Sequence, residues 1–203
     1  MQEPLLSDTR LVGGTSLALQ IGHRKSTDLD LFSTNMPEIE SIVTTLKAKY
    51  GYTPQHISEE TTIGFIDGIK IDVIHHPYKW LDDNIQEDDI RLATKKDIAA
   101  MKMHAITNSG TRPKDFVDIA FLSCSFSYDQ ISEFTLDKYP LYDQIMLDRA
   151  IIYFGDVNME LIENIKMIDF QMNWDKVQKR LLSMTDKPDK VFLNPPLKAH
   201  MSE

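Results

Sequence analysis

Short runs of alternating apolar and polar residues mark the first half of the chain, and helical spacing dominates the second half. Residues 27–32, 61–66 and 69–74 have the period-two pattern of half-buried strands, and a short strand is expected at residues 11–12. Asp67-Gly68 separates two of these segments and is a strong signal for a two-residue hairpin turn. The first half is therefore predicted to form a sheet.

Helical segments are interspersed with these strands and then follow them. We expect them at residues 15–21, 37–50, 96–108, 113–124, 128–134, 142–154, 159–168 and 174–183. Asn35 is expected to cap the helix at 37–50 and Gly51 to end it. The acidic run Asp82–Asp89 is interpreted as a solvated loop. The pattern predicts an α+β half followed by a helical half, with the boundary near residues 80 to 95.

Composition narrows the class of protein. The chain has 203 residues, of which 42% are hydrophobic and 26% charged, as in ordinary globular proteins. Its single cysteine, Cys124, excludes an internal disulfide framework, and no apolar run is long enough to span a bilayer, so we expect a cytoplasmic protein without a membrane partner. The net charge of -9 argues against a protein that coats nucleic acid by charge alone.

Three carboxylates occupy related positions on the predicted strands. Asp28 and Asp30 are two residues apart, so both project from one face while Leu29 and Leu31 point to the other. Asp72 lies in a second apolar strand in the same way. If the strands are neighbours, the three carboxylates converge and repel one another unless a cation lies between them. Such an oxygen-only set suits Mg²⁺ or Mn²⁺.

A glycine turn precedes these carboxylates. Gly13-Gly14 allows the backbone to approach a phosphate closely, and the helix that follows offers free N–H groups and the positive end of its dipole. The hydroxyls of Thr15 and Ser16 can add hydrogen bonds to the same phosphates. Each part is common by itself. Their order and spacing together favour a site for a nucleoside triphosphate and its metal ions, and hence a nucleotidyltransferase.

A second group of charges lies on the predicted helices at 96–108 and 113–124. Lys102 is flanked by apolar residues at helical spacing, where a lysine is costly unless its ammonium reaches phosphates, carboxylates or solvent. Asp115 and Asp118 lie about one turn apart on the next helix. Either can pair with Lys102 or act as a base, although Asp115 can also serve as a first-turn carboxylate. Arg112 precedes that helix and can contact phosphate.

Other candidate residues allow two interpretations each. His23-Arg24-Lys25 can place positive charge over a triphosphate, and a solvated turn explains His23 equally well. His75-His76 is not expected to bind a metal, because adjacent residues of a strand point apart. Cys124 follows an apolar run and is expected to be buried and inert.

Five stretches carry a resemblance to a known family. Residues 11–20, 22–24 and 26–32 read LVGGTSLALQ, GHR and STDLDLF, and residues 97–102 and 112–118 read DIAAMK and RPKDFVD. Together they resemble the AbiEii/AbiGii-type nucleotidyltransferase toxins of the DNA polymerase β superfamily. The resemblance covers residue 11 to about residue 122.

The resemblance implies a polymerase β-like core with a mixed sheet at residues 1–90. It further implies a helical domain at 91–203 that contributes Lys102 and either Asp115 or Asp118 to the active site. Asp28 and Asp30 would bind metal, as we expect of Asp72 from its strand. The expected nucleotide-binding residues are Gly13, Gly14, Thr15, Arg24, Ser26 and Lys102.

The expected activity is the Mg²⁺-dependent transfer of a nucleoside monophosphate from a triphosphate to an acceptor hydroxyl. Relatives are toxins of bacterial toxin–antitoxin or phage-defence pairs, and some modify transfer RNA, so the resemblance implies a tRNA acceptor and an antitoxin partner. A protein or an aminoglycoside-like small molecule is an alternative acceptor. A module that binds a nucleotide or a partner without catalysis is a third possibility.

Overall fold

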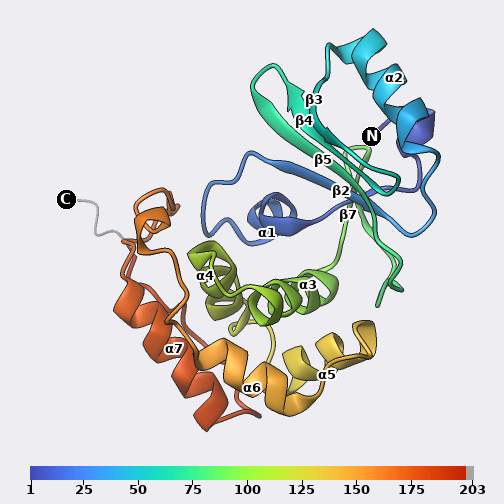
Figure 1. Ribbon diagram of the computed structural model, residues 1–203. Helices are drawn as coiled ribbons and strands as arrows, with labels where there is room; N and C mark the ends of the chain where they lie inside the picture. Colours follow the sequence, from blue (N-terminus) through green and yellow to red (C-terminus); the bar gives the residue numbers. More distant parts are fainter. Residues whose placement is uncertain (200–203) are drawn as a thin grey trace. The chain divides into compact units, whose positions relative to one another are not determined.

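The computed structural model describes residues 1–199, which fall into two compact units (Figure 1). The first unit contains Met1–Ser16 and Ser26–Thr94. The second contains Leu17–Lys25 and the described residues from Lys95 onward. Its main segment thus begins at the end of the interval in which the sequence placed a boundary. Residues 17–25 join it from the N-terminal half, and residues 200–203 of the expected helical domain lie outside the described residues.

A seven-stranded mixed sheet forms the framework of the first unit, with the strand order β3-β4-β5-β2-β1-β7-β6. The strands are β1 (Arg10–Leu11), β2 (Leu29–Ser33), β3 (Thr53–Ile57), β4 (Thr61–Ile66), β5 (Ile69–His75), β6 (Ile85–Glu87) and β7 (Ile90–Leu92). The pairs β2–β5 and β1–β7 are parallel, and the other four are antiparallel. β2 and β5 are adjacent although β3 and β4 lie between them in the sequence.

Two tight turns explain the hairpins of this sheet. Asp67 and Gly68 have φ values of 50° and 79°, the positive values that a type I′ turn requires, so the predicted hairpin is confirmed. Asp88 and Asp89 also have positive φ and connect β6 with β7. The interpretation of Asp82–Asp89 as a solvated loop was therefore wrong for β6. This short edge strand pairs through its backbone and leaves its side chains exposed, so it needs no apolar pattern.

Nine helical segments accompany the sheet in the described residues. They are η1 (Pro4–Leu6), α1 (Gly13–Ile21), α2 (Ile39–Tyr50), α3 (Lys95–Asn108), α4 (Pro113–Leu122), α5 (Tyr128–Lys138), α6 (Gln144–Ile152), η2 (Met159–Leu161) and α7 (Trp174–Asp186). None of these helices within residues 1–199 has the length and apolarity needed to cross a membrane.

The predicted helices differ from the observed ones at two places. Helix α2 ends at Gly51 as expected, but it begins at Ile39 with Glu38 as its cap, and the Asn35 side chain binds Asp8 instead. The helix expected at 159–168 is reduced to the single turn η2. Its last residues form backbone hydrogen bonds with the segment 23–25, from Lys25 N to Lys166 O at 2.7 Å and from Ile168 N to His23 O at 3.0 Å. Pairing between distant segments has overridden the local helical pattern.

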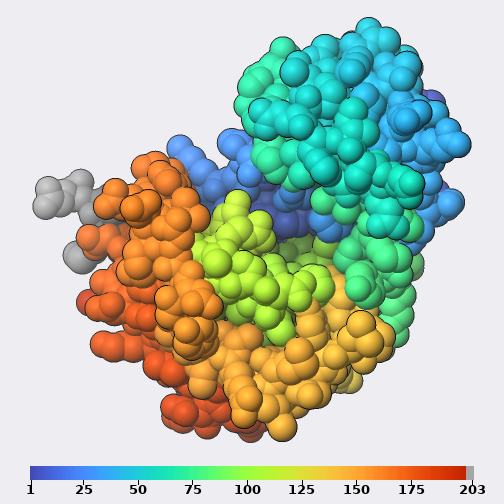
Figure 2. Space-filling model, viewed as in Figure 1, coloured from blue at the N-terminus to red at the C-terminus, as the bar shows by residue number. Residues whose placement is uncertain are grey.

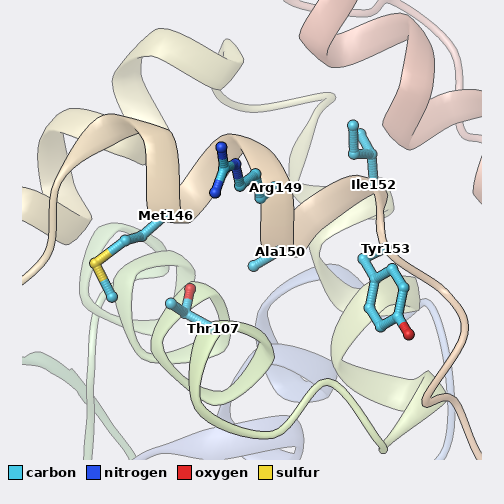
Figure 3. A pocket seen from close by; sticks show the side chains of 6 residues that line it. All are labelled: Thr107, Met146, Arg149, Ala150, Ile152 and Tyr153. Carbon is cyan, nitrogen blue, oxygen red and sulfur yellow. The ribbon is translucent and has the colours of Figure 1, made fainter.

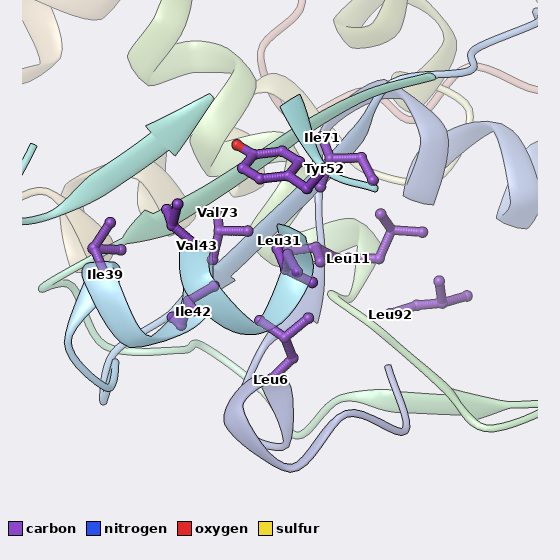
Figure 4. Packing of buried hydrophobic residues seen from close by; sticks show 11 residues of the cluster. Leu6, Leu11, Leu31, Ile39, Ile42, Val43, Tyr52, Ile71, Val73 and Leu92 are labelled. Atoms are coloured by element: carbon purple, nitrogen blue, oxygen red, sulfur yellow. The ribbon is translucent and has the colours of Figure 1, made fainter. Parts of the chain in front are cut away.

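One apolar cluster holds the first unit together. Ile39, Ile42, Val43 and Leu46 of α2 are buried in the same cluster as Leu11, Leu31, Ile71 and Val73 of the sheet (Figure 4). On the side of α2 away from the core, and along strand β3, exposed side chains form part of the surface seen in Figure 2, drawn in blue to cyan. A pocket of about 400 Å³ is lined by Leu29, Leu31, Ile71 and other apolar residues of this unit.

The second unit has its own aromatic core. Phe116 of α4 packs against Phe154 and Trp174, with ring centroids 5.6 and 6.0 Å apart. Helices α3 and α4 supply most of its fully buried side chains, among them Ile98, Met103 and Ile119. Each unit therefore buries apolar surface of its own.

We expect Ile42→Ala to lower the free energy of unfolding by about 2–5 kcal/mol, because it deletes a side chain that is 1% exposed and leaves a cavity between α2 and the sheet. Chemical denaturation measures the change. The exposed Thr44→Ala on the same helix is the control and should change stability by less than about 0.5 kcal/mol. Equal effects of the two substitutions would contradict this account of the core.

Candidate functional site

The parallel pair β2–β5 brings two of the predicted carboxylates together. In its register Asp30 lies opposite Asp72, between the apolar partners Leu29–Ile71 and Leu31–Val73. Residues in register on neighbouring strands share a face, so both carboxylates project from the side of the sheet opposite the apolar core. Figure 1 shows the two strands side by side.

Asp72 has an incompletely satisfied carboxylate. The residue is 8% exposed, and its Oδ2 accepts a hydrogen bond from Lys70 Nζ at 2.5 Å. Its Oδ1 is buried and has no hydrogen-bond partner. A buried carboxylate oxygen without a donor is costly, and a bound cation would remove the cost.

The glycine turn lies directly against Asp30. Gly13 has a φ of 67°, and a β-carbon at this position would lie 2.2 Å from Asp30 Oδ2. Only a glycine therefore allows this contact. The backbone N–H of Val12 donates to the carbonyl oxygen of Asp30 at 2.9 Å, which ties the turn to β2.

Hydroxyl groups line the start of β2. Thr15 Oγ1 lies 3.0 Å from Ser26 Oγ and donates to the carbonyl oxygen of Asp28 at 2.5 Å. Ser16 Oγ donates to the carbonyl oxygen of Ala93. Thr15 and Ser26 are thus assembled beside Asp28, as the spacing of the motif suggested. The hydroxyls of Thr15 and Ser16 donate to the protein in this structure.

The donor set fits a hard divalent cation in part. Asp30 and Asp72 offer adjacent carboxylates, and Asp72 Oδ1 lacks a partner. However, no group of three or more His, Cys, Asp or Glu side chains within residues 1–199 is arranged to hold a metal ion. The expected convergence of three carboxylates is therefore not present as a ready-made set, because Asp28 lies outside the β2 ladder, which begins at Leu29. Mg²⁺ commonly uses one or two carboxylates and completes its coordination with water and phosphate oxygens.

The second unit contains a buried network of charges centred on Asp118. Arg24 forms two hydrogen bonds to this carboxylate, from Nε at 2.6 Å and from Nη2 at 2.8 Å. Lys102 Nζ lies 2.7 Å from Oδ2, and His23 Nε2 lies 2.8 Å from Oδ1. All four side chains are buried. One carboxylate of α4 thus joins α3 to the segment that follows α1.

This arrangement determines the protonation states. Burial by itself would raise the pKa of Asp118, but the charges of Lys102 and Arg24, with the hydrogen bonds from Arg24 and His23, hold it well below its usual range. Burial would lower the pKa of Lys102, and the carboxylates of Asp115 and Asp118 outweigh that effect and raise it. Asp118 is therefore a stable anion and Lys102 a stable cation.

Asp115 completes the network, so both candidate carboxylates pair with Lys102. Lys102 Nζ donates to Asp115 Oδ1 at 2.6 Å, and Arg112 Nε donates to Asp115 Oδ2 at 2.8 Å. The Arg112 side chain is half exposed, whereas Asp115 is buried. Asp118 differs from Asp115 in being fully enclosed and shared among three other residues.

His23 is the residue that the sequence described least well. The solvated turn that we considered for it is wrong, because the side chain is fully buried against Phe121, with ring centroids 5.1 Å apart. Its Nδ1 is buried without a hydrogen-bond partner. The pairing of residues 23–25 with 166–168 encloses it, and no local pattern indicates that pairing.

The remaining candidates have ordinary surroundings. His75 and His76 point apart as expected, since His75 lies near Glu60 and His76 packs against Phe32. Cys124 is half-buried and not fully buried as expected, and its thiol contacts the carbonyl oxygen of Asn194. A pair that the sequence did not identify, Lys138 and Asp97, is fully buried with 2.9 Å between Nζ and Oδ1.

An open pocket of the second unit lacks the predicted site residues. It has a volume of about 640 Å³ and lies between Thr107 of α3 and α6, whose Met146, Arg149 and Ile152 line it together with Tyr153 (Figure 3). The lining is mainly apolar and contains no carboxylate. It therefore offers no group for phosphate transfer other than the Arg149 cation.

We expect Asp118→Asn to lower the free energy of unfolding at neutral pH by about 3 kcal/mol or more, because it leaves Lys102 and Arg24 buried with less countercharge. The depressed pKa makes the stabilisation by Asp118 complete above the unfolded pKa of about 4, and this stabilisation is lost as the pH falls below that value. Denaturation between pH 7 and pH 2 measures both effects.

In that titration the variant should show a smaller loss of stability below pH 4 than the parent protein. The exposed Glu133→Gln of α5 carries the same change of charge and serves as the control, with the parent's pH profile. An unchanged acid limb in Asp118→Asn would contradict the assignment of Asp118 as the central anion.

Comparisons with known proteins agree with this fold. At 30% identity over 185 residues, the chain is similar to the uncharacterized protein aq_aa25 of Aquifex aeolicus (strain VF5), with 86% of this chain and 85% of that one covered. The crystal structure of JHP933 from Helicobacter pylori is similar with a TM-score of 0.56 and 16% identity, covering 91% of this chain and 87% of that one. A second H. pylori crystal structure has a TM-score of 0.55 and 15% identity, with 91% and 89% covered.

A family model decides the assignment. The model described as "Nucleotidyl transferase AbiEii toxin, Type IV TA system" matches residues 39–194, most of the chain. The resemblance inferred from the sequence is confirmed, as is the α+β fold with a polymerase β-like core and a helical C-terminal part. With this match, and with a mixed sheet that carries Asp30 beside Asp72, the chain belongs to the AbiEii family of nucleotidyltransferase toxins.

Proposed function

We propose that the protein uses a divalent cation, Mg²⁺ or Mn²⁺, to transfer a nucleoside monophosphate from a triphosphate to the 3′ hydroxyl of a transfer RNA. The observation that carries this proposal is the pairing of Asp30 with Asp72, whose buried Oδ1 has no hydrogen-bond partner, beside a turn that only glycine can form. Carboxylates next to an N-terminal helix turn suit a triphosphate with its metal.

The residues of the first unit take these roles. Asp30 and Asp72, with Asp28 at the start of β2, hold the cation, which neutralises phosphate charge and activates the attacking oxygen. Gly13 and Gly14 at the start of α1, with the hydroxyls of Thr15 and Ser26, accommodate the phosphates.

The reaction is a substitution at the α-phosphorus. The acceptor oxygen forms a bond to this phosphorus, the bond to the bridging oxygen breaks, and pyrophosphate leaves with its electron pair. The proton of the acceptor hydroxyl passes to solvent. Correct positioning of the two oxygens on opposite sides of the phosphorus is the main task of the protein.

The predicted catalytic roles of Lys102, Asp115 and Asp118 stay predictions, as does nucleotide binding by Arg24. The observed contacts support a positioning role for Asp118, because a carboxylate whose pKa is strongly lowered is a poor base. Arg24 and Lys102 are both bound to Asp118. Lys102 remains a cation in this network and keeps the charge that binding to a phosphate requires.

The biological setting follows from the family. We propose that the protein is the toxin of a toxin–antitoxin or phage-defence pair, with an antitoxin as its partner and the cytoplasm as its location. The family description names a type IV toxin–antitoxin system. The net charge of -9 also favours a second acceptor class, a cationic small molecule or a protein, because it does not attract RNA.

The first experiment combines each α-³²P-labelled nucleoside triphosphate with Mg²⁺ and bulk tRNA. We expect label in the RNA with at least one nucleotide, and we expect Asp28→Asn with Asp30→Asn to reduce transfer by roughly a hundredfold or more, since both groups hold the cation. The double variant Glu59→Gln with Asp83→Asn removes two exposed carboxylates of the same unit and should transfer normally.

Three outcomes separate the alternatives. Label in a protein lysate or an aminoglycoside but not in RNA would redirect the proposal to those acceptors. Triphosphate binding with Mg²⁺ but without turnover on any acceptor would favour a binding module. Transfer that persists in the Asp28/Asp30 double variant would refute the assignment of the carboxylates.

We expect Gly13→Ala to abolish most of the transfer, because its β-carbon would displace the Asp30 carboxylate. Gly22→Ala is a matched control: its φ of 62° imposes similar backbone strain, but its β-carbon meets no atom within 4 Å. Both variants should lose roughly 1–2 kcal/mol of stability from strain. Initial transfer rates with melting curves distinguish the effects, and equal rates in the two variants would contradict the role of Gly13.

A further inference from the structure

An aromatic cluster lies where β2 and β5 end, on the carboxylate side of the sheet. His76 is 7% exposed and lies at its centre, with ring centroids 5.3 Å from Phe32, 5.0 Å from Tyr78 and 6.0 Å from Trp80. The three outer rings are only half-buried. The His76 N–H donates to the carbonyl oxygen of Ser33 at 2.8 Å, which fixes the cluster to the end of β2.

A cation belongs to this cluster. The guanidinium of Arg10 lies over the Trp80 ring, 4.4 Å from its centroid, and Nη1 donates to the carbonyl oxygen of Asp82 at 2.7 Å. Arg10 is the β1 partner of Phe32 in the sheet register. Half-exposed aromatic rings with a fixed arginine are the combination that binds single-stranded nucleic acid, through base stacking and attraction to the backbone.

The position of the cluster relative to the carboxylates is determined by β2. Thr15 and Ser26 lie beside Asp28, Gly13 lies beside Asp30, and Phe32 follows two residues farther on the same face. Two residues of a strand span roughly 7 Å, close to the separation of neighbouring nucleotides. Along this strand the carboxylates therefore lie between the proposed phosphate-binding groups and the aromatic rings.

The chemistry of phosphoryl transfer gives this order a meaning. The attacking and leaving oxygens lie roughly in line on opposite sides of the phosphorus. If pyrophosphate leaves on the side of Gly13 and Thr15, the acceptor enters from the side of Phe32. We propose, resting on the proposed function, that Phe32, Tyr78 and Trp80 with Arg10 bind the terminal nucleobase of a single-stranded RNA acceptor.

A fluorescence titration tests this binding without turnover. The chain has two tryptophans, so Trp174→Phe leaves Trp80 as the sole indole reporter. We expect a six-nucleotide single-stranded RNA to quench Trp80, and the same oligonucleotide with an abasic 3′ end to bind roughly tenfold or more weakly. A nucleoside triphosphate with Mg²⁺ should not quench it. Trp80→Phe, which retains Trp174, is the matched control and should show no quenching by RNA.

Quenching by the triphosphate alone would assign the cluster to the donor base and overturn the proposal, as would equal affinity for the intact and abasic RNA. An unchanged Trp80 signal with RNA would also overturn it. Because this readout needs no catalysis, quenching without label transfer refutes only the proposed function. Transfer to RNA without quenching refutes only the aromatic site.

Steady-state kinetics give a second readout. Trp80→Leu should raise KM for the RNA roughly tenfold and leave KM for the triphosphate unchanged, and Trp80→Phe should restore most of the loss because it keeps an aromatic face. Tyr153→Leu removes an exposed aromatic side chain of the second unit and should change neither KM. A rise in KM for the triphosphate, or equal effects of Trp80→Leu and Tyr153→Leu, would overturn the proposal.

Discussion

The parallel pairing of β2 with β5 is the constraint on which the first unit depends. Its register places apolar partners Leu31 and Val73 on one face and the two carboxylates Asp30 and Asp72 on the other. A shift by one residue would bury the carboxylates in the core, so burial of the apolar face enforces the adjacency of two like charges. The sheet thereby maintains an electrostatic arrangement that is unfavourable without a cation.

Asp118 performs a comparable task in the second unit. A single carboxylate with a lowered pKa neutralises Lys102 and Arg24 and holds His23, which lies 95 residues away in the sequence. Such a network is strongly destabilised when one member is lost, because the others stay buried without countercharge. This dependence explains how a residue that does no chemistry can be indispensable to the fold.

The two charge arrangements illustrate different uses of buried acids. Asp118 is surrounded by donors, so its charge is satisfied within the protein. Asp72 has Lys70 on one oxygen and nothing on the other. Unsatisfied buried oxygens are uncommon and are a sign of a site for an external ligand. The contrast, and not the number of carboxylates, distinguishes the candidate reaction site from a structural network.

The sequence by itself determined the features that depend on local physics. The positive-φ turn at Asp67-Gly68, the strand periods of β4 and β5, and the start of α4 at Pro113 follow from neighbouring residues. The alternation of Asp28 and Asp30 likewise predicted their common face. Family membership was also visible in the sequence, because its motifs are short and contiguous.

Only the tertiary structure decided which distant segments meet. The register that sets Asp30 beside Asp72, the burial of His23, and the convergence of Phe32 with Trp80 and Arg10 join residues far apart in the chain. The helical pattern at 159–168 was overridden for the same reason, since residues 166–168 pair with 23–25. Local propensities amount to only a few tenths of a kcal/mol per residue, and long-range pairing and burial exceed them.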